Sequence, residues 1–507
     1  VHPLVRPAYF IAGNMRVVDL LSEMKQRRLQ FAVVVDDLGA MVGDKLKDED
    51  KKAAQALLDG KPDVAAAYQI EGAWDTDGKG PSVWDEFTHG RGPLGLRRIK
   101  DGATGDVATD SYHRFEEDIA LVAAMGFSAY RFSISWPRVM PDGTGAVNAA
   151  GLDYYSRVVD ACLAAGIEPW VTLYHWDLPA ALERRGGWTN REIVGWFSDY
   201  VSVVVAALGD RVRQWMVFNE PLSFTMLGYL LGAHAPGRRG PAAFCAAAHH
   251  VNLATAEGAR AARAASPRSD ASIGTTQYLS PVLASGVGPL AGIAERSADA
   301  LVNRLFLEPN LGLGYPWDDC GLLRGIKRHH RPGDDELATI DLDFLGVQYY
   351  TRLRAPWLPI PGIWTIPHFG QDRGCELTSM GWEVRPEGLG MVLDRVHAYG
   401  AYDRVVVTES GASFDEELVD GRVHDNRRIA YFQRHLAELR ATIDRGVPVE
   451  GYFCWSLLDN FEWTFGYRPR FGLVHVDYAT QHRVVKDSGR WFARLLGGRA
   501  ADDASQG

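Results

Sequence analysis

Cysteine is scarce in this sequence, with five residues in a chain of 507. Their odd number, their scatter along the chain and the lack of any C-x-x-C spacing exclude a disulfide framework and a cysteine-based zinc site. We therefore expect reduced thiols and a cytoplasmic protein. The five cysteines are Cys162, Cys245, Cys320, Cys375 and Cys454.

Long apolar runs and excess positive charge are also missing. No run of 18 apolar residues occurs, and the first thirty residues lack the core of a signal peptide, so no membrane association is predicted. The formal net charge of −10 argues against nucleic acid or an anionic membrane as a partner. No metal-ligand cluster, phosphate-cradling glycine loop or Ser-His-Asp set stands out, and we predict neither metal nor cofactor.

Aromatic residues, in contrast, are plentiful: the chain has 15 Trp and 19 Tyr. Sugar rings present apolar C–H faces that stack on aromatic side chains, so this composition suits a carbohydrate site. It suits a large hydrophobic core equally well, and composition alone leaves both interpretations open.

From about Asp63, strand-like apolar runs alternate with amphipathic helical segments, which is typical of a parallel sheet with helical crossovers. We predict an α/β fold, a (β/α)₈ TIM barrel, whose chemistry lies at the C-terminal ends of the strands. The predicted strands are 64–69, 129–134, 168–174, 214–218, 271–277, 344–348, 404–408 and 450–456. The predicted helices include 116–125, 151–165, 191–208, 242–265, 426–445 and 488–496. The segment 356–374 is predicted to be a long excursion after the sixth strand.

The first 62 residues have a different pattern and predict a short N-terminal α/β extension. Asn14 is placed to cap a helix that runs to about Arg28, and a buried strand over 31–35 follows. A charged, helix-prone segment covers 44–59. The predicted division is an extension over 1–62, a catalytic barrel over 63–498 and a tail over 499–507.

Two of the barrel strands end in carboxylates. The apolar run 215–218 leads into Asn219 and Glu220, and the run 405–408 leads into Glu409. Carboxylates are poor strand formers and are costly to bury unpaired, so these positions suggest a site better than a core. Two facing carboxyl groups can act as general acid and as nucleophile, provided that a closed sheet brings them together.

Polar or aromatic residues also lie at or near the C-terminal ends of other predicted strands. A single Gln or His at such a position is usually structural, whereas the combined set favours a site. The remaining candidates are Gln69, Arg131, His175, Trp176, Tyr350, Trp455, Glu462 and Trp463.

With these residues in place, the chain resembles glycoside hydrolase family 1, the β-glucosidase and β-galactosidase family. The resemblance covers about 65–498, and its matching motifs include Tyr68–Gly72, Tyr130–Trp136 and Phe218–Pro221. It implies a retaining β-glycosidase that works by double displacement, without a cofactor.

The resemblance implies a role for each central residue. Glu409 is the expected nucleophile, with Arg131 beside it and a hydrogen bond from the Tyr350 hydroxyl. Glu220 is the expected acid/base, with a pKa raised by the negative charge of Glu409. Asn219 is expected at the sugar 2-hydroxyl, and the two carboxyl groups are expected about 5–5.5 Å apart.

The substrate implied by the resemblance is a small β-glucoside or cello-oligosaccharide, with galactosyl and fucosyl residues also open. Glu462 is expected to repel a 6-phosphate and so to disfavour phosphorylated sugars. The residues matched to sugar binding are Gln69, His175, Trp176, Asn219, Tyr350, Trp455, Glu462 and Trp463, with Arg131 in support.

Three positions depart from the family pattern. Ser410 follows the nucleophile where Asn is usual, Gln348 stands where Asn is usual, and Leu222 replaces a Trp found in many relatives. The first two are expected to alter hydrogen bonds behind the site. The third leaves leaving-group preference open. The usual lead-in to the first strand is also missing, so either the N-terminal segment completes that strand or the strand is short.

Two rival functions and one variant of the chemistry stay open. A non-catalytic sugar-binding barrel is the first rival, although it predicts the loss of one of the two Glu. The run 10–43 weakly resembles one motif of a CBS domain, so a nucleotide-regulated glycosidase is the second. A single copy lacks the groove between paired copies, which favours a non-binding appendage. Transglycosylation and the oligomeric state are not decided by the sequence.

Overall fold

The computed structural model describes residues 63–497, except 93–94, 287 and 357–366, together with the backbone of two short N-terminal strands. Contacts divide the chain into two units, Val1–Ala56 and Leu57–Gly507. In the first unit, β1 (Phe10–Ile11) pairs in parallel with β2 (Val33–Val34), inside the strand predicted over 31–35. The helices predicted over 14–28 and 44–59 lie outside the described residues, as does the tail over 499–507. The predicted domain boundaries stay predictions.

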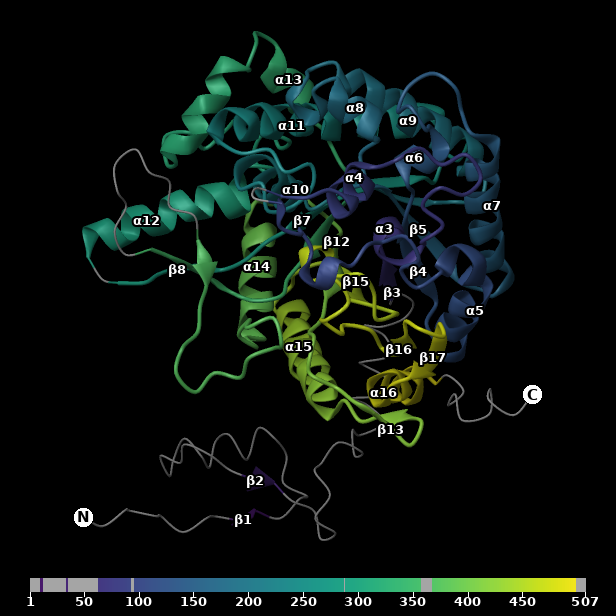
Figure 1. The fold of residues 1–507 in the computed structure, drawn as a ribbon. Helices are drawn as coiled ribbons and strands as arrows, with labels where there is room; N and C mark the ends of the chain where they lie inside the picture. Colours follow the sequence, from purple (N-terminus) through teal and green to yellow (C-terminus); the bar gives the residue numbers. More distant parts are fainter. Residues whose placement is uncertain are drawn as a thin grey trace. The chain divides into compact units, whose positions relative to one another are not determined.

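The second unit is a closed barrel of eight parallel strands, in the order β12-β15-β3-β4-β5-β6-β7-β9, and this confirms the predicted fold. Helices surround the strands (Figure 1). The strands are β3 (Asp63–Ala65), β4 (Ala129–Ser133), β5 (Glu168–Tyr174), β6 (Gln214–Asn219), β7 (Ser272–Tyr278), β9 (Phe344–Gln348), β12 (Val405–Ser410) and β15 (Val449–Cys454).

Each strand is followed by helical structure, as the alternating pattern predicts. The outer helices are α5 (Ser111–Ala124), α7 (Ala149–Ala164), α9 (Ile193–Leu208), α11 (Pro241–Ala265), α12 (Pro289–Asp299), α14 (Glu387–Ala398), α15 (Asn426–Asp444) and α16 (Asp487–Leu496). The helix predicted over 116–125 begins earlier, at Ser111. None of the described helices has the length and apolar character needed to cross a bilayer.

Large aromatic side chains fill the inside of the barrel. Trp170 of β5 packs its ring 5.4 Å from Phe344 of β9 and 5.3 Å from Phe453 of β15, measured between centroids. Gly274 of β7 makes room for this packing, because a Cβ there would lie 2.6 Å from the Phe344 ring. The barrel is therefore a packed core, and functional side chains are left to its rim.

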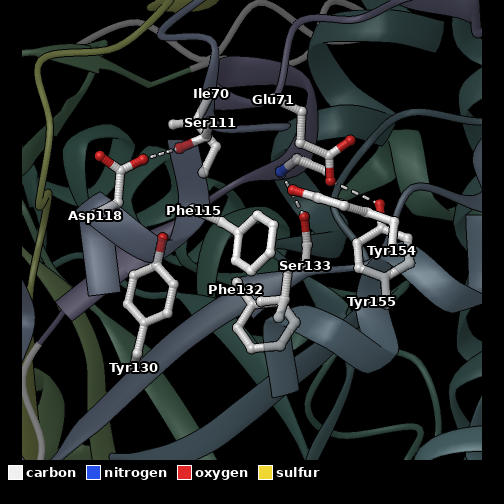
Figure 2. Close-up of a pocket in the computed structure, with 12 residues that line it drawn as sticks. Ile70, Glu71, Ser111, Phe115, Asp118, Tyr130, Phe132, Ser133, Tyr154 and Tyr155 are labelled. Atoms are coloured by element: carbon white, nitrogen blue, oxygen red, sulfur yellow. Dashed lines mark hydrogen bonds between the residues drawn. The ribbon is translucent and has the colours of Figure 1, made fainter. Parts of the chain in front are cut away.

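The prediction for the first strand is wrong in its extent. Strand β3 covers Asp63–Ala65 only, and the next residues form a helical turn, α3 (Ala67–Ile70). The Ala67 N–H donates to Ser133 Oγ of β4 at 2.8 Å, beside a small cavity lined by Glu71 and Tyr155 (Figure 2). This contact from a neighbouring strand favours the turn, and the first strand is short.

The excursion after β9 forms a small sheet of its own. Strand β10 (Leu353–Ala355) pairs in parallel with β8 (Val282–Ala284) and antiparallel with β11 (His368–Phe369). Of the predicted excursion over 356–374, the structure describes Pro356 and residues 367–374.

Candidate active site

Arg131 of β4 joins the two strands that carry the candidate carboxylates. Its Nη1 donates to Glu409 Oε1 at 2.7 Å, and its Nη2 donates to Asn219 Oδ1 at 2.6 Å. The Nε donates to Thr172 Oγ1 of β5 at 3.0 Å, so all three guanidinium nitrogens are engaged. The C-terminal ends of β6 and β12 therefore meet over one buried guanidinium.

Glu409 is buried and receives two strong hydrogen bonds. Besides Arg131, the Tyr350 hydroxyl donates to Glu409 Oε2 at 2.7 Å, so both contacts expected from the sequence are present. Burial raises the pKa of Glu409, while the Arg131 charge and the hydrogen bonds from Tyr350 and Gln348 lower it. Because bonds to both carboxylate oxygens favour the charged form, Glu409 is the more readily ionised of the two glutamates.

Glu220 lies in a different environment at the junction between β6 and α10 (Pro221–Thr225). Its backbone is left-handed, with φ 43°, and its N–H donates to Thr276 O at 3.0 Å. Burial, followed by the negative charge of Glu409, raises the pKa of Glu220 to about 8. Glu220 is thus a proton donor at neutral pH, next to a carboxylate that holds its charge.

The hydrogen bonds around Asn219 fix which atom of each neighbour is a donor. Asn219 Oδ1 accepts from Arg131 and from Gln348 Nε2, the latter at 2.7 Å, so its Nδ2 faces His175 Nε2 at 3.0 Å. That nitrogen of His175 must accept, which places the ring proton on Nδ1. Burial and the nearby Arg131 lower the pKa of His175 well below its usual value, so the ring is neutral.

Two buried polar atoms of the predicted sugar-binding residues are left for a ligand. His175 Nδ1 and Gln69 Oε1 have no hydrogen-bond partner within the described part of the chain. The first is a donor and the second an acceptor, and buried groups of this kind are normally satisfied. A hydroxylated ligand would complete both.

Gln69 is held by the segment that follows β15. Its Nε2 donates to Phe461 O at 2.9 Å, and it lies 3.4 Å from Glu462 Oε2. Burial and the charge of Glu409 raise the pKa of Glu462 to about 8, so this glutamate shares the electrostatic environment of the pair. Gln69, Glu462 and Glu409 thus belong to one site.

Tryptophan rings pack together around these polar groups. Trp463 stacks on Trp176 with 4.6 Å between centroids and lies 4.6 Å from Trp84. Trp176 Nε1 donates to Asn219 O at 2.9 Å, and the Trp455 ring lies 6.3 Å from His175. The predicted residues from seven strand ends are therefore brought together.

Backbone strain is concentrated in the same place. Trp176, Glu220 and Trp463 all have left-handed backbones, with φ of 79°, 43° and 46°. Such conformations are unfavourable for residues with a Cβ and cluster at functional sites, where the surrounding structure holds them.

The sequence analysis missed Thr172, and it named Gln348 only as a departure from the family pattern. Thr172 accepts from Arg131, and a single hydroxyl within the apolar run 170–173 was the available signal. Gln348, one methylene longer than Asn, reaches Asn219 directly. Ser410 Oγ lies 3.1 Å from the Tyr431 hydroxyl, behind the site. Leu222 is buried in the main hydrophobic core.

The chemistry open to this arrangement is proton transfer and nucleophilic attack by carboxylates. Over the described residues, no group of three or more His, Cys, Asp or Glu side chains is placed to hold a metal ion.

Comparison with known proteins agrees with this geometry. The family described as Glycosyl hydrolase family 1 matches residues 63–499. Beta-glucosidase A of Thermotoga maritima is 41% identical over 458 residues, which cover 87% of this chain and 97% of that protein. A bifunctional beta-D-glucosidase/beta-D-fucosidase of Bifidobacterium breve is 40% identical, over 86% of this chain and 97% of its own length.

Solved structures give the same result. Beta-glucosidase from Thermotoga maritima in complex with glucoimidazole superposes with a TM-score of 0.80 at 40% identity, over 87% of this chain and 98% of that one. The same enzyme in complex with deoxynojirimycin has a TM-score of 0.80 at 39% identity, over the same shares of the two chains. The chain belongs to glycosyl hydrolase family 1.

Proposed function

We propose that this protein is a retaining β-glucosidase that removes terminal β-D-glucosyl residues from small glucosides or cello-oligosaccharides. The observation that carries the proposal is the unequal environment of two buried carboxyl groups. Glu409 receives hydrogen bonds from Arg131 and Tyr350, whereas the pKa of Glu220 is raised to about 8. One glutamate is suited to attack as an anion and the other to deliver a proton.

In the first half of the reaction, Glu409 attacks the anomeric carbon while Glu220 protonates the departing oxygen. The glycosyl-enzyme that forms is an ester of Glu409, so the negative charge beside Glu220 is lost. The pKa of Glu220 then falls, and it can take a proton from the attacking water in the second half. Two inversions at the same carbon give a product with retained configuration.

The remaining predicted residues bind the sugar in this proposal. Asn219, whose carboxamide is held by Arg131 and Gln348, meets the 2-hydroxyl. The unpartnered His175 Nδ1 and Gln69 Oε1, with Glu462, meet the other hydroxyls, and tryptophan rings flank the ring faces. These tryptophans are Trp176, Trp455 and Trp463.

The relatives support glucose as the sugar and leave fucose open, since the Bifidobacterium breve relative carries both activities in its name. The structure describes all five cysteines and joins none of them in a disulfide, which fits a reducing compartment, and we propose the cytoplasm as the location of the protein.

A panel of nitrophenyl β-glycosides tests the proposal: glucoside, galactoside, fucoside, mannoside and 6-phosphoglucoside. We expect the glucoside to be hydrolysed, with β-glucose as the first product in proton NMR, and the 6-phosphoglucoside to be rejected near Glu462. A sugar-binding barrel without catalysis would bind glucose and release no nitrophenol. Regulation through residues 10–43 would instead appear as heat on titration with adenine nucleotides.

A further inference from the structure

A second polar cleft lies on the outside of the barrel, lined by residues that the proposed reaction does not use. Its volume is about 460 Å³, and none of its lining side chains is acidic. Three segments form it: the residues before α9, the first half of α11, and the end of the 3₁₀ helix η6 (Gly321–Arg328) with the residues after it. The lining residues are Thr189, Asn190, Arg191, His250, Arg328, His329 and Arg331.

The cleft carries excess positive charge. Arg191 is held by a two-pronged ion pair with Asp334, with Nη1 at 2.9 Å from Oδ2. Arg328 and Arg331 are exposed and have no carboxylate partner within the described part of the chain. Two guanidinium charges are therefore left uncompensated, in a chain whose net charge is −10.

His250 adds a hydrogen-bond acceptor to this cleft. The side chain is 4% exposed, and Nδ1 lies 2.9 Å from the Trp188 carbonyl, to which it can only donate. Burial lowers the pKa of His250 to about 4, so the ring is neutral and Nε2 holds a lone pair. That atom has no hydrogen-bond partner among the residues that the structure describes.

Two polar side chains on the adjacent wall of the cleft already form hydrogen bonds within the protein, which hold them in place. Thr189 Oγ1 donates to Gly186 O at 2.7 Å and accepts from Arg238. Asn190 donates to Arg185 O and accepts from the Glu192 N–H, both at 3.0 Å. The groups open to a ligand are thus the two free arginines, His329 and the lone pair of His250.

We propose that this cleft binds phosphate, with Arg328 and Arg331 holding the oxyanion and His250 Nε2 accepting a hydroxyl of the same ligand. Guanidinium groups match phosphate oxygens in charge and geometry. The acceptor on His250 selects a ligand that also carries an O–H. Hydrogen phosphate has one on phosphorus, and a sugar phosphate has several on carbon. Sulfate has the same shape but no O–H at neutral pH.

Calorimetry on the full chain at constant ionic strength tests this proposal, with inorganic phosphate, glucose 6-phosphate and sulfate as probes. We expect phosphate to bind one to one, at least about fivefold more tightly than sulfate. The double variant R328Q/R331Q should weaken phosphate binding by about tenfold or more. Arg296→Gln is the matched control, because Arg296 is an exposed arginine on α12 outside the cleft. It should bind phosphate as the parent does.

Binding of glucose 6-phosphate more tightly than inorganic phosphate would identify a phosphorylated small molecule as the ligand, and the reverse order would identify the free ion. The variant His250→Phe should lose the preference for phosphate over sulfate. If His250→Phe does not fold, the R328Q/R331Q variant still tests the proposal. The proposal is overturned if neither phosphate probe binds at up to about 10 mM. It is also overturned if R328Q/R331Q binds as the parent does, or if sulfate binds as tightly as phosphate.

Discussion

Arg131 and Glu409 form an ion pair at 2.7 Å in which both side chains are buried. Removing one member of such a pair leaves the other charge uncompensated in a medium of low polarity. A variant that lacks the Glu409 carboxylate therefore keeps a positively charged space beside the proposed position of the anomeric carbon, suited to a small anion.

We predict that Glu409→Gly loses hydrolysis by about four orders of magnitude or more, because no nucleophile is left. Azide or formate should restore part of the rate by entering the space beside Arg131. With azide only one displacement occurs, so the product should be the α-glucosyl azide, identified by proton NMR. Chloride at the same ionic strength is the control. Formation of a β-azide would show that another group acts as the nucleophile.

For Glu220→Ala we predict a loss that depends on the leaving group. Dinitrophenolate departs without protonation, so its glycosylation step should slow by less than about tenfold, whereas an alkyl glucoside should lose about a thousandfold or more. Pre-steady-state measurement separates this step from the second. Azide should now give the β-glucosyl azide, since Glu409 still acts first. Equal losses for both substrates would rule out the acid role.

The pKa of Glu220, raised to about 8, predicts that the pH profile of activity has an alkaline limb, in which activity falls as the pH rises. For an alkyl glucoside, kcat/KM should fall as the pH rises through about 8, because the acid loses its proton. Glu220→Gln should be nearly inactive on that substrate, and on a dinitrophenyl glucoside, whose leaving group needs no proton, it should show no fall in activity near pH 8. Glu462 has a pKa raised to a similar value, so Glu462→Gln is the control and should keep the limb.

The same shift affects folding stability. In the unfolded chain Glu220 loses its proton near 4.5, whereas in the folded protein it keeps it until about pH 8. The stabilisation is therefore complete below about pH 4.5 and is lost as the pH rises towards 8. Urea unfolding of Glu220→Gln should show a smaller decline across that window than the parent does.

Lys486 holds Asp459, in the segment that follows β15, through a buried ion pair. Its Nζ contacts Asp459 at 2.8 Å and Glu416 at 2.6 Å, and all three side chains are almost fully buried. We predict that Lys486→Met lowers the free energy of unfolding by about 3 kcal/mol, because two buried carboxylates each lose one of their two cationic partners. Asp459 keeps Arg470, and Glu416 keeps Arg428. Arg468→Met, which breaks the exposed pair with Asp101, should leave the urea midpoint close to that of the parent. Equal shifts in the two variants would contradict the prediction.

The strands were predictable where they are long and apolar. The runs 168–174 and 344–348 form strands with the predicted limits, since β-branched and aromatic residues there meet both the core and the helices. The first strand was not predictable in the same way. The run 64–70 is rich in alanine, which favours helix over strand, and the Ser133 contact from a neighbouring strand also favours the turn.

In the site, residue types were easier to predict than orientations. Carboxylates and amides that interrupt apolar strands marked Glu220, Glu409 and Asn219. The sequence carries no information on which way the Asn219 carboxamide is turned, or on the reach of Gln348 to it. These details depend on distances between strands that are far apart in the chain, such as the 2.7 Å from Gln348 Nε2 to Asn219 Oδ1.

The short first strand affects how the barrel closes. Strand β3 meets β15 through one residue pair, Asp63 with Cys454. Above that pair, Gln69 and Phe461 exchange two hydrogen bonds, Nε2 to O at 2.9 Å and N to O at 3.1 Å. Gln69, proposed to bind the sugar, therefore also links the segments that follow β3 and β15, the first and last strands of the barrel. A bound glucose mimic should slow amide hydrogen exchange near Gln69 and Phe461 more than elsewhere on the rim of the barrel. Sugar binding would then stabilise the contact between the first and last strands, and that contact would in turn favour sugar binding.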